Sequence, residues 1–328
     1  MTLIASVIAK NGVVIIADSL VTNVEPIIKL ADFYKILNQK KDENNKGKIK
    51  KQKVRFSSEE IDDLFHMVPS YTKNYEDKLI KYDNHSAITI AGNSIINKKR
   101  ISQIIQDIAQ KYQHKFISNN QTIEEKIEFF IKHVEEEIKL HFKNENHLQA
   151  STFLFTNYDI ELKKTTIYKI GINYTKKEEY ENNKGKIINK KQSEEYEKVV
   201  CTGQNRMSER LLYGDIFVAY DLIGRVTKKV ISDYKIDNIK NIDDYISNLR
   251  SDRDIISQDM FSDIKLFKLE ELSLQQAVDL AYLLMKIEVD FQQYTENIPT
   301  VGGVIKIAVI DENGFKFVAG DEIISPIK

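Results

Sequence analysis

A threonine at position 2 and an aspartate at position 18 are the first residues of this chain whose types and spacing could do chemistry. Apolar runs lie on both sides of Asn11-Gly12, a pair that favours a tight turn, so we expect a hairpin that returns Asp18 to the chain start. Methionine aminopeptidases remove Met1 when the next residue is as small as threonine. Thr2 would then carry both a hydroxyl nucleophile and a free α-amine that could serve as its base.

The composition argues against several other kinds of site. The 328 residues carry 48 Lys and Arg against 49 Asp and Glu, so a net charge of -1 gives no general field for nucleic acid or for an anionic membrane. Six histidines and one cysteine show no metal-ligand spacing, and we expect neither a metal nor another cofactor. We find no signal-peptide pattern and no apolar run of membrane-spanning length, so a cytoplasmic location is the default expectation.

Predicted strands and helices follow one another in blocks. Capping-box patterns predict helices that begin after Thr122 and Ser273, and helical spacing of apolar residues predicts another from Ile101. Apolar runs bounded by polar turns predict strands over 86–91, 151–156, 165–170, 199–202 and 301–310, and from 315. This order predicts an α+β fold in which two sheets pack together and a helical layer covers each.

The sequence predicts a single domain over residues 1–328 that carries three insertions. The first covers about 39–82 and opens with Lys, Asn, Asp and Glu residues that have almost nothing to bury. The second, 175–198, is also polar, and the third, about 214–267, has a mostly helical pattern. We expect all three to be additions to the core fold.

Four separated motifs together resemble the proteasome β-subunit branch of the N-terminal nucleophile (Ntn) hydrolases. They are the hairpin that ends in Ala17-Asp18-Ser19, Thr89-Ile-Ala-Gly92, Cys201-Thr-Gly-Gln204, and the stretch from Thr300 to Ile310. Their order and spacing carry the resemblance, because none of them is specific alone. It implies the four-layer αββα sandwich of that class, closest in style to bacterial proteasome-like proteins.

The resemblance implies a role for each matching residue. Thr2 would be the nucleophile and its α-amine the general base. The N–H of Gly92 would stabilise the tetrahedral oxyanion. Asp18 would hold and orient a lysine that lowers the pKa of the α-amine. Thr202 lies where the family has a serine and can still offer a hydroxyl.

Two lysines compete for that position. Lys35 lies one residue further from the nucleophile than the family lysine usually does, and Lys29 is the other candidate. The sequence Phe33-Tyr-Lys-Ile-Leu37 alternates as a strand does and could direct Lys35 inward. We therefore assign the role to Lys35.

The resemblance also predicts how substrate binds. Val21 and Ile90 would line the pocket for the side chain before the scissile bond. Thr22 and Ser94 would hold the substrate as an extended strand between two backbone edges. The chain departs from the family just before the Gly-Gly turn, where Ile298 and Val301 stand in place of the usual aspartate and serine.

The resulting hypothesis is a threonine peptidase that hydrolyses polypeptide through an acyl-enzyme. It would work inside a self-compartmentalising homo-oligomeric ring, and the resemblance leaves open an ATPase unfoldase as a partner. Two alternatives remain. One is a proteasome-like scaffold or assembly subunit without catalysis, which the altered residues at 298 and 301 favour. The other is an Ntn amidohydrolase that acts on a small amide, since a fold does not fix its substrate.

Overall fold

The computed structural model describes residues 2–44, 56–57, 61, 64–74, 76–115, 121–194, 197–213, 216–234, 244, 269, 271–295 and 298–320. The helices in these ranges are α1 (Leu30–Asn44), α3 (Ile101–Lys115), α4 (Ile123–Asn144), α5 (Lys177–Asn182), α6 (Arg206–Tyr213), α7 (Ile216–Asp233), α10 (Leu274–Phe291) and the 3-10 turn η1 (Gln292–Tyr294). The strands are β1 (Leu3–Ala9), β2 (Gly12–Ala17), β3 (Leu20–Ile28), β4 (Phe65–Asn74), β5 (Leu79–Lys81), β6 (Ser86–Gly92), β7 (Ile95–Ile96), β8 (Lys99–Arg100), β9 (His147–Leu148), β10 (Ser151–Asp159), β11 (Lys164–Ile172), β12 (Thr175–Lys176), β13 (Ile188–Gln192), β14 (Val199–Gly203), β15 (Lys306–Asp311) and β16 (Gly314–Ala319).

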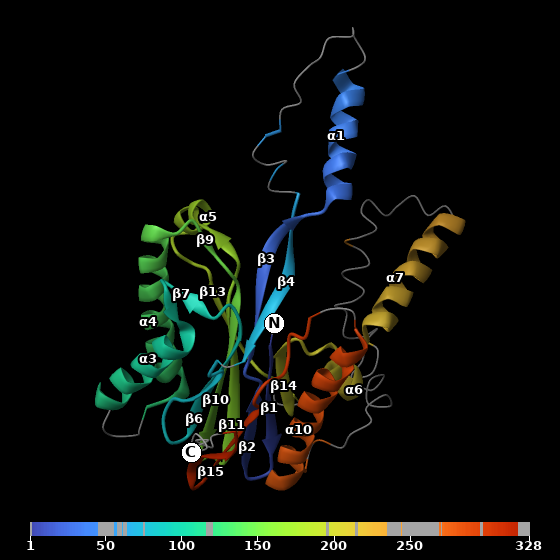
Figure 1. Ribbon diagram of the computed structural model, residues 1–328. Helices are drawn as coiled ribbons and strands as arrows, with labels where there is room; N and C mark the ends of the chain where they lie inside the picture. Colours follow the sequence, from blue (N-terminus) through green and yellow to red (C-terminus); the bar gives the residue numbers. More distant parts are fainter. Residues whose placement is uncertain are drawn as a thin grey trace, which may run out of the picture.

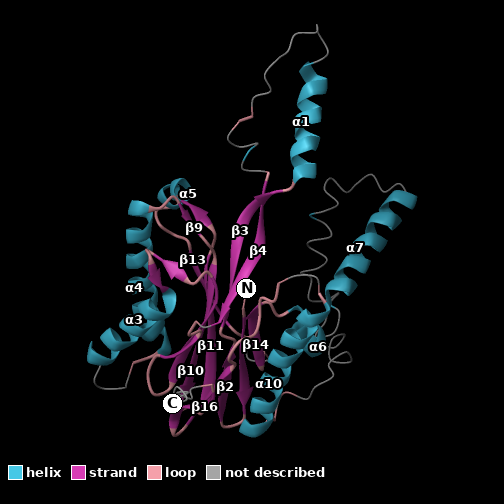
Figure 2. Ribbon diagram, viewed as in Figure 1, coloured by secondary structure: helices cyan, strands magenta, loops and turns pink. Residues whose placement is uncertain are grey.

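Two five-stranded antiparallel sheets form the centre of the fold (Figure 1). The first has the order β14-β1-β2-β15-β16, and the second has the order β13-β11-β10-β6-β5. Helices α3 and α4 lie beside the second sheet, whereas α6 and α10 lie beside the first (Figure 2). The chain is therefore an α+β protein with antiparallel sheets, as its element order predicts.

Strand β1 shows why its sequence is apolar at almost every position. Leu3, Ala5 and Val7 face a core cluster shared with α10, while Ile4 faces a second cluster shared with the other sheet. A strand that is covered on both faces has no solvent side, so it does not alternate between apolar and polar residues. The one hydroxyl in its middle, Ser6, bonds Thr156 of β10 at 2.8 Å across the two sheets.

The second sheet divides its side chains in the same way. Ile88 of β6 and Phe153 of β10 pack into a cluster with residues of α3 and α4, whereas Ala91 and Leu154 point to the other sheet. This alternation follows from the two-residue period of a strand. Packing between the sheets and under the helices therefore fixes where the ends of β1 and β6 lie.

The opening hairpin forms as predicted, but its turn differs by one residue. Ala9 pairs with Gly12, so Lys10 and Asn11 make the turn and Gly12 begins β2. A Cβ on Gly12 would lie 2.5 Å from the carbonyl oxygen of Ile310 in β15. The glycine is thus required by the close approach of a neighbouring strand. As expected, the hairpin returns Asp18 to the chain start, where its N–H bonds the Leu3 carbonyl at 3.4 Å.

The predicted strand over Phe33–Leu37 is wrong, because these residues belong to helix α1. Strands β3 and β4 pair with each other as a two-stranded ribbon, and α1 follows β3 at the far end of that ribbon from Thr2 (Figure 1). Five alternating residues are too few to separate strand from helix, and the Gln, Lys and Glu residues that follow favour a helix. We call β3, α1 and β4 together the arm.

The boundaries of the predicted insertions also change. The segment 39–82 takes in β5, which belongs to the second central sheet, and leaves out β3, where the arm begins. The segment 175–198 contains β12, α5 and β13, the last of which pairs with β11. Of 214–267, only 216–234 and residue 244 lie among the described residues, and α7 accounts for the helical prediction there. None of the described helices is long and apolar enough to cross a membrane.

Candidate active site

Lys78 is the lysine that the structure places against Thr2. Its Nζ lies 2.7 Å from the Thr2 hydroxyl oxygen, 3.0 Å from Asp18 Oδ1 and 2.5 Å from the Leu20 carbonyl oxygen. An ammonium group has three hydrogens and no lone pair, so these three acceptors match its charged form. The Thr2 hydroxyl accepts from Lys78 and keeps its own hydrogen for a base.

The residues just before Lys78 hold it at the edge of the second sheet. Glu76 accepts a 2.5 Å hydrogen bond from Ser102 at the start of α3, and its N–H bonds the Ser19 carbonyl at 3.0 Å. Asp77 pairs with Lys306 of β15 at 2.5 Å. Three consecutive charged residues therefore contact three different elements. This arrangement leaves the Lys78 side chain directed at the start of β1.

Asp18 uses both of its carboxylate oxygens. Oδ1 faces Lys78, and Oδ2 accepts a 3.1 Å hydrogen bond from the N–H of Gly302. The Lys78 side chain is 7% exposed and that of Asp18 is fully buried. Asp18 thus contacts a lysine, but it is Lys78 and not the predicted Lys35, and the role of Asp18 in orienting it stays a prediction.

Burial works against both charges of this pair. It raises the pKa of the Asp18 carboxyl, and Lys78 opposes that rise. It lowers the pKa of the Lys78 ammonium, and Asp18 opposes that fall. A buried ion pair adds little net stability, because removing two charges from water costs about as much as their attraction returns. Its place beside a threonine hydroxyl is more typical of a functional site.

Thr2 is held by the edge strand β14. Leu3 pairs with Gly203, and the N–H of Gln204 donates to the Thr2 carbonyl at 2.7 Å. A Cβ on Gly203 would collide with that same carbonyl oxygen, and the φ of Gly203 is 95°. Only glycine tolerates both conditions. Thr2 itself is 3% exposed.

Gly92 lies at the end of β6, close to the same point. A Cβ on Gly203 would be 3.3 Å from the Ala91 side chain, so Ala91 and the Thr2 main chain flank Gly203 together. Gly92 has a φ of 102°, and a Cβ there would lie 2.6 Å from the Ala150 carbonyl oxygen. The start of β1 and the end of β6 therefore lie close together. The assignment of the Gly92 N–H to an oxyanion stays a prediction.

The assignment of the lysine role to Lys35 does not agree with the structure. Lys35 is exposed on α1, and the competing candidate Lys29 is exposed just before it. Lys78 lies 60 positions from Asp18, inside the segment that the sequence analysis treats as an insertion. The signal that could have found it is the charged run Glu76-Asp-Lys78 directly before the apolar start of a strand.

The four predicted substrate-binding residues occupy different environments. Val21 and Thr22 are half-buried at the base of β3, where the Thr22 hydroxyl donates to the Pro299 carbonyl at 2.9 Å. Ser94 is half-buried after β6, and its carbonyl accepts from the Ile101 N–H at 2.8 Å. Ile90 is buried in the cluster under α3 and α4. Their roles toward substrate stay predictions.

The remaining predicted positions lie around Gln204. Thr202 is buried in β14 opposite Ile4. The N–H of Gln204, two residues further along the chain, makes the hydrogen bond to Thr2. Val301 packs in the apolar cluster under α10, so its environment suits a valine better than a serine. Burial raises the pKa of the Cys201 thiol to about 12, which disfavours the thiolate form that a nucleophilic cysteine needs.

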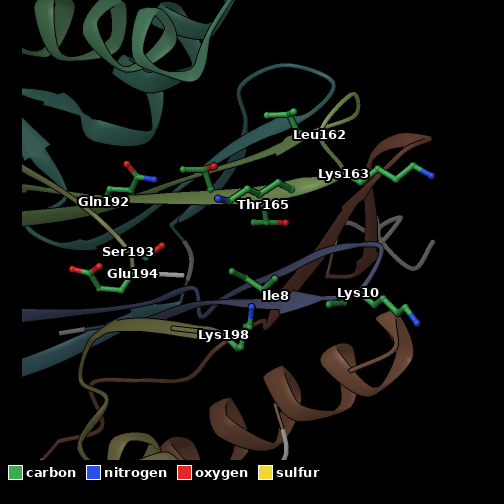
Figure 3. Close-up of a pocket in the computed structure, with 12 residues that line it drawn as sticks. Ile8, Lys10, Leu162, Lys163, Thr165, Gln192, Ser193, Glu194 and Lys198 are labelled. Carbon is green, nitrogen blue, oxygen red and sulfur yellow. The ribbon is translucent and has the colours of Figure 1, made fainter. Parts of the chain in front are cut away.

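A pocket of about 520 Å³ opens at the other end of β1 (Figure 3). Ile8 and Lys10 line it from the hairpin, and Lys163 and Thr165 line it from the turn before β11 and from that strand. Neither Thr2, Asp18 nor Lys78 contributes to its lining. Among the described residues, no group of His, Cys, Asp and Glu side chains could hold a metal ion.

No family model matches the chain, and a search of curated proteins finds no match.

Proposed function

We propose that this chain is a threonine-type Ntn hydrolase that cleaves peptide bonds through an acyl-enzyme on Thr2. The observation that carries the proposal is the buried contact of Lys78 Nζ with both the Thr2 hydroxyl and Asp18. The two packed sheets, with helices beside each, support the four-layer αββα sandwich that the sequence resemblance implies.

The proposed reaction requires processing that leaves Thr2 at the start of the mature chain. The α-amine then takes the hydroxyl proton, while Lys78 stabilises the developing negative charge on the oxygen. The oxygen attacks the amide carbon, and the N–H of Gly92 stabilises the resulting oxyanion. The α-ammonium gives its proton to the leaving amine, and an ester on Thr2 remains. Water hydrolyses this ester and restores the hydroxyl.

Intact mass and active-site labelling of the purified protein test this proposal. We expect a mass that begins at Thr2 and covalent labelling of that residue by an electrophile directed at N-terminal threonine. Thr2→Ala should abolish labelling and leave the fold unchanged. A protein that turns over peptide while it retains residues before Thr2 would contradict the mechanism, since the base would then be an amide nitrogen.

A specific observation favours a second candidate, the scaffold without catalysis. Ile298 and Val301 replace the acidic and hydroxyl side chains that the family places near its nucleophile, and Val301 is buried among apolar residues. The same labelling experiment separates the two candidates. A mature chain that begins at Thr2 and is not labelled supports the scaffold. Turnover of small amides but not of peptides would instead support the amidohydrolase.

Closed homo-oligomerisation is part of the proposal. The outer helices carry exposed apolar side chains, Leu140 on α4 and Tyr282 and Leu283 on α10, which suit contacts between copies. Closed symmetry is the usual result for a homo-oligomer. We expect light scattering at micromolar protein to give a mass several times that of one chain. A monomer across this range would argue against compartmentalised proteolysis.

A further inference from the structure

Gln292, at the C-terminal end of α10, holds a stretch of main chain that lies outside the strands. Its Oε1 accepts hydrogen bonds from the N–H groups of Thr300 at 2.5 Å and Val301 at 3.1 Å. Its Nε2 donates to the carbonyls of Glu288 at 2.8 Å and Val301 at 3.4 Å, so the orientation of the amide is fixed. Gln292 is 5% exposed. Buried N–H groups need partners, and here a side chain supplies what a neighbouring strand supplies inside a sheet.

The next residue along the chain, Gly302, contacts the active site through both of its main-chain polar groups. Its N–H donates to Asp18 Oδ2 at 3.1 Å. Its carbonyl accepts from the N–H groups of Ser19 at 3.1 Å and Leu20 at 2.9 Å. Asp18 and the Leu20 carbonyl are in turn two of the three acceptors that surround Lys78 Nζ. Gly302 therefore holds the segment that directs the lysine at the nucleophile.

We propose that Gln292 is a positioning residue of the active site, which acts by keeping Gly302 on Asp18. Without the Gln292 oxygen, the main chain directly before Gly302 loses two hydrogen bonds and can move away from the carboxylate. Asp18 then has one fixed partner fewer, and Lys78 is less well oriented. This inference rests on the proposed function, because the orientation of Lys78 affects catalysis only if Thr2 reacts.

Gln292→Met tests the proposal, because it removes both polar atoms of the amide and keeps an unbranched side chain of similar length. We expect kcat to fall about tenfold with little change in KM, since the variant disturbs the charged groups at the nucleophile and not the binding of substrate. The matched control is Gln275→Met in the first turn of α10. The Gln275 side chain is exposed and bonds only Asp279 in the same helix, at 2.9 Å, so kcat should not change.

The pH dependence separates positioning from a loss of packing. Burial raises the pKa of the Asp18 carboxyl to about 6, while Lys78, the Gly302 N–H and the positive charge at the chain start each act to lower it. Losing the Gly302 hydrogen bond should raise this pKa by about one further unit. More Asp18 is then protonated at pH 6, so the ratio of wild-type to Gln292→Met kcat/KM should be about fivefold larger at pH 6 than at pH 8. Weakened packing alone would give equal ratios.

Amide hydrogen exchange, followed by peptide mass, gives a readout that needs no activity. In Gln292→Met, the N–H groups of Ser19 and Leu20 should exchange about tenfold faster than in the control, because both donate to the Gly302 carbonyl. Unchanged exchange there would overturn the inference even if Thr2 is labelled as proposed. Faster exchange in a protein whose Thr2 is not labelled would sustain the coupling to Gln292 and overturn the proposed function.

Folding of each variant is checked by circular dichroism. If Gln292→Met does not fold, Gln292→Asn replaces it, because a side chain one carbon shorter keeps the amide but cannot reach both N–H groups. The same directions of change are expected in kcat, in the pH ratio and in exchange. A folded Gln292→Asn variant that matches the control in all three would overturn the inference.

Discussion

Lys78→Ala should reduce peptide turnover by roughly a hundredfold to a thousandfold, the range found when one preorganised donor is removed from an active site. The reason is the 2.7 Å contact between Lys78 Nζ and the Thr2 hydroxyl, which stabilises the charge that develops on that oxygen. Lys35→Ala is the matched control. It removes the same side chain from the exposed surface of α1 and should leave turnover unchanged. Steady-state kinetics with a peptide amide would measure both.

The control for folding is needed because Lys78→Ala leaves Asp18 buried without its cation. Removing one partner of a buried ion pair costs about 3 to 5 kcal/mol. The double variant Asp18→Asn with Lys78→Ala relieves that cost and should remain inactive. Its loss of turnover should be much smaller than the sum of the two single losses, since residues that act as a unit are not additive. An active Lys78→Ala variant with an inactive Lys35→Ala variant would remove the structural basis of the mechanism.

Gly203→Ala should be the most destabilising glycine-to-alanine substitution in the site. The new Cβ would collide with the Thr2 carbonyl oxygen, and a φ of 95° is strained for alanine. We expect a loss of about 3 kcal/mol or more in the free energy of unfolding, together with loss of activity from a displaced Thr2. Thermal unfolding monitored by circular dichroism would measure the first effect.

Gly185→Ala provides the comparison for this prediction. Gly185 also has a positive φ, 77°, but the nearest atom to a Cβ there would be the Tyr180 hydroxyl oxygen, at 3.3 Å. The backbone strain should therefore cost about 1 to 2 kcal/mol without the collision. If both variants lowered the melting temperature equally, the close approach of β14 to Thr2 would not exist in solution.

Local signals explain which parts of the fold could be predicted from the sequence. The capping boxes at Thr122 and Ser273 both form, because each depends on residues three positions apart. The opening hairpin and the return of Asp18 to the chain start are also short-range. The start of β15 depends on contacts distant in sequence. Residues 301–305 are predicted as strand, but they form an irregular segment outside the sheet that contacts Asp18 and Gln292.

The lysine could not be predicted in the same way. Its position depends on β5 joining the second sheet after the chain has passed through the arm. No local sequence pattern predicts how many residues the arm contains. Lys35 fits the expected spacing and Lys78 does not, yet only Lys78 lies at Thr2. The contacts of the Thr300 hydroxyl with the side chains of Gln204 and Gln292 could not be predicted either, because these residues lie 96 and 8 positions from Thr300 along the chain.

Hydrogen bonds between the residues where β3 begins and the residues just after β4 close the base of the arm. Glu76 bonds the carbonyl of Ser19, and Lys78 bonds the carbonyl of Leu20. The entropy lost in closing a flexible loop grows only with the logarithm of its length, so doubling the arm would cost about 0.6 kcal/mol. Residues can thus be gained or lost beyond this closure with little effect on the free energy of the site. The number of residues between Asp18 and Lys78 can therefore change, whereas the place of the lysine beside Thr2 and Asp18 cannot.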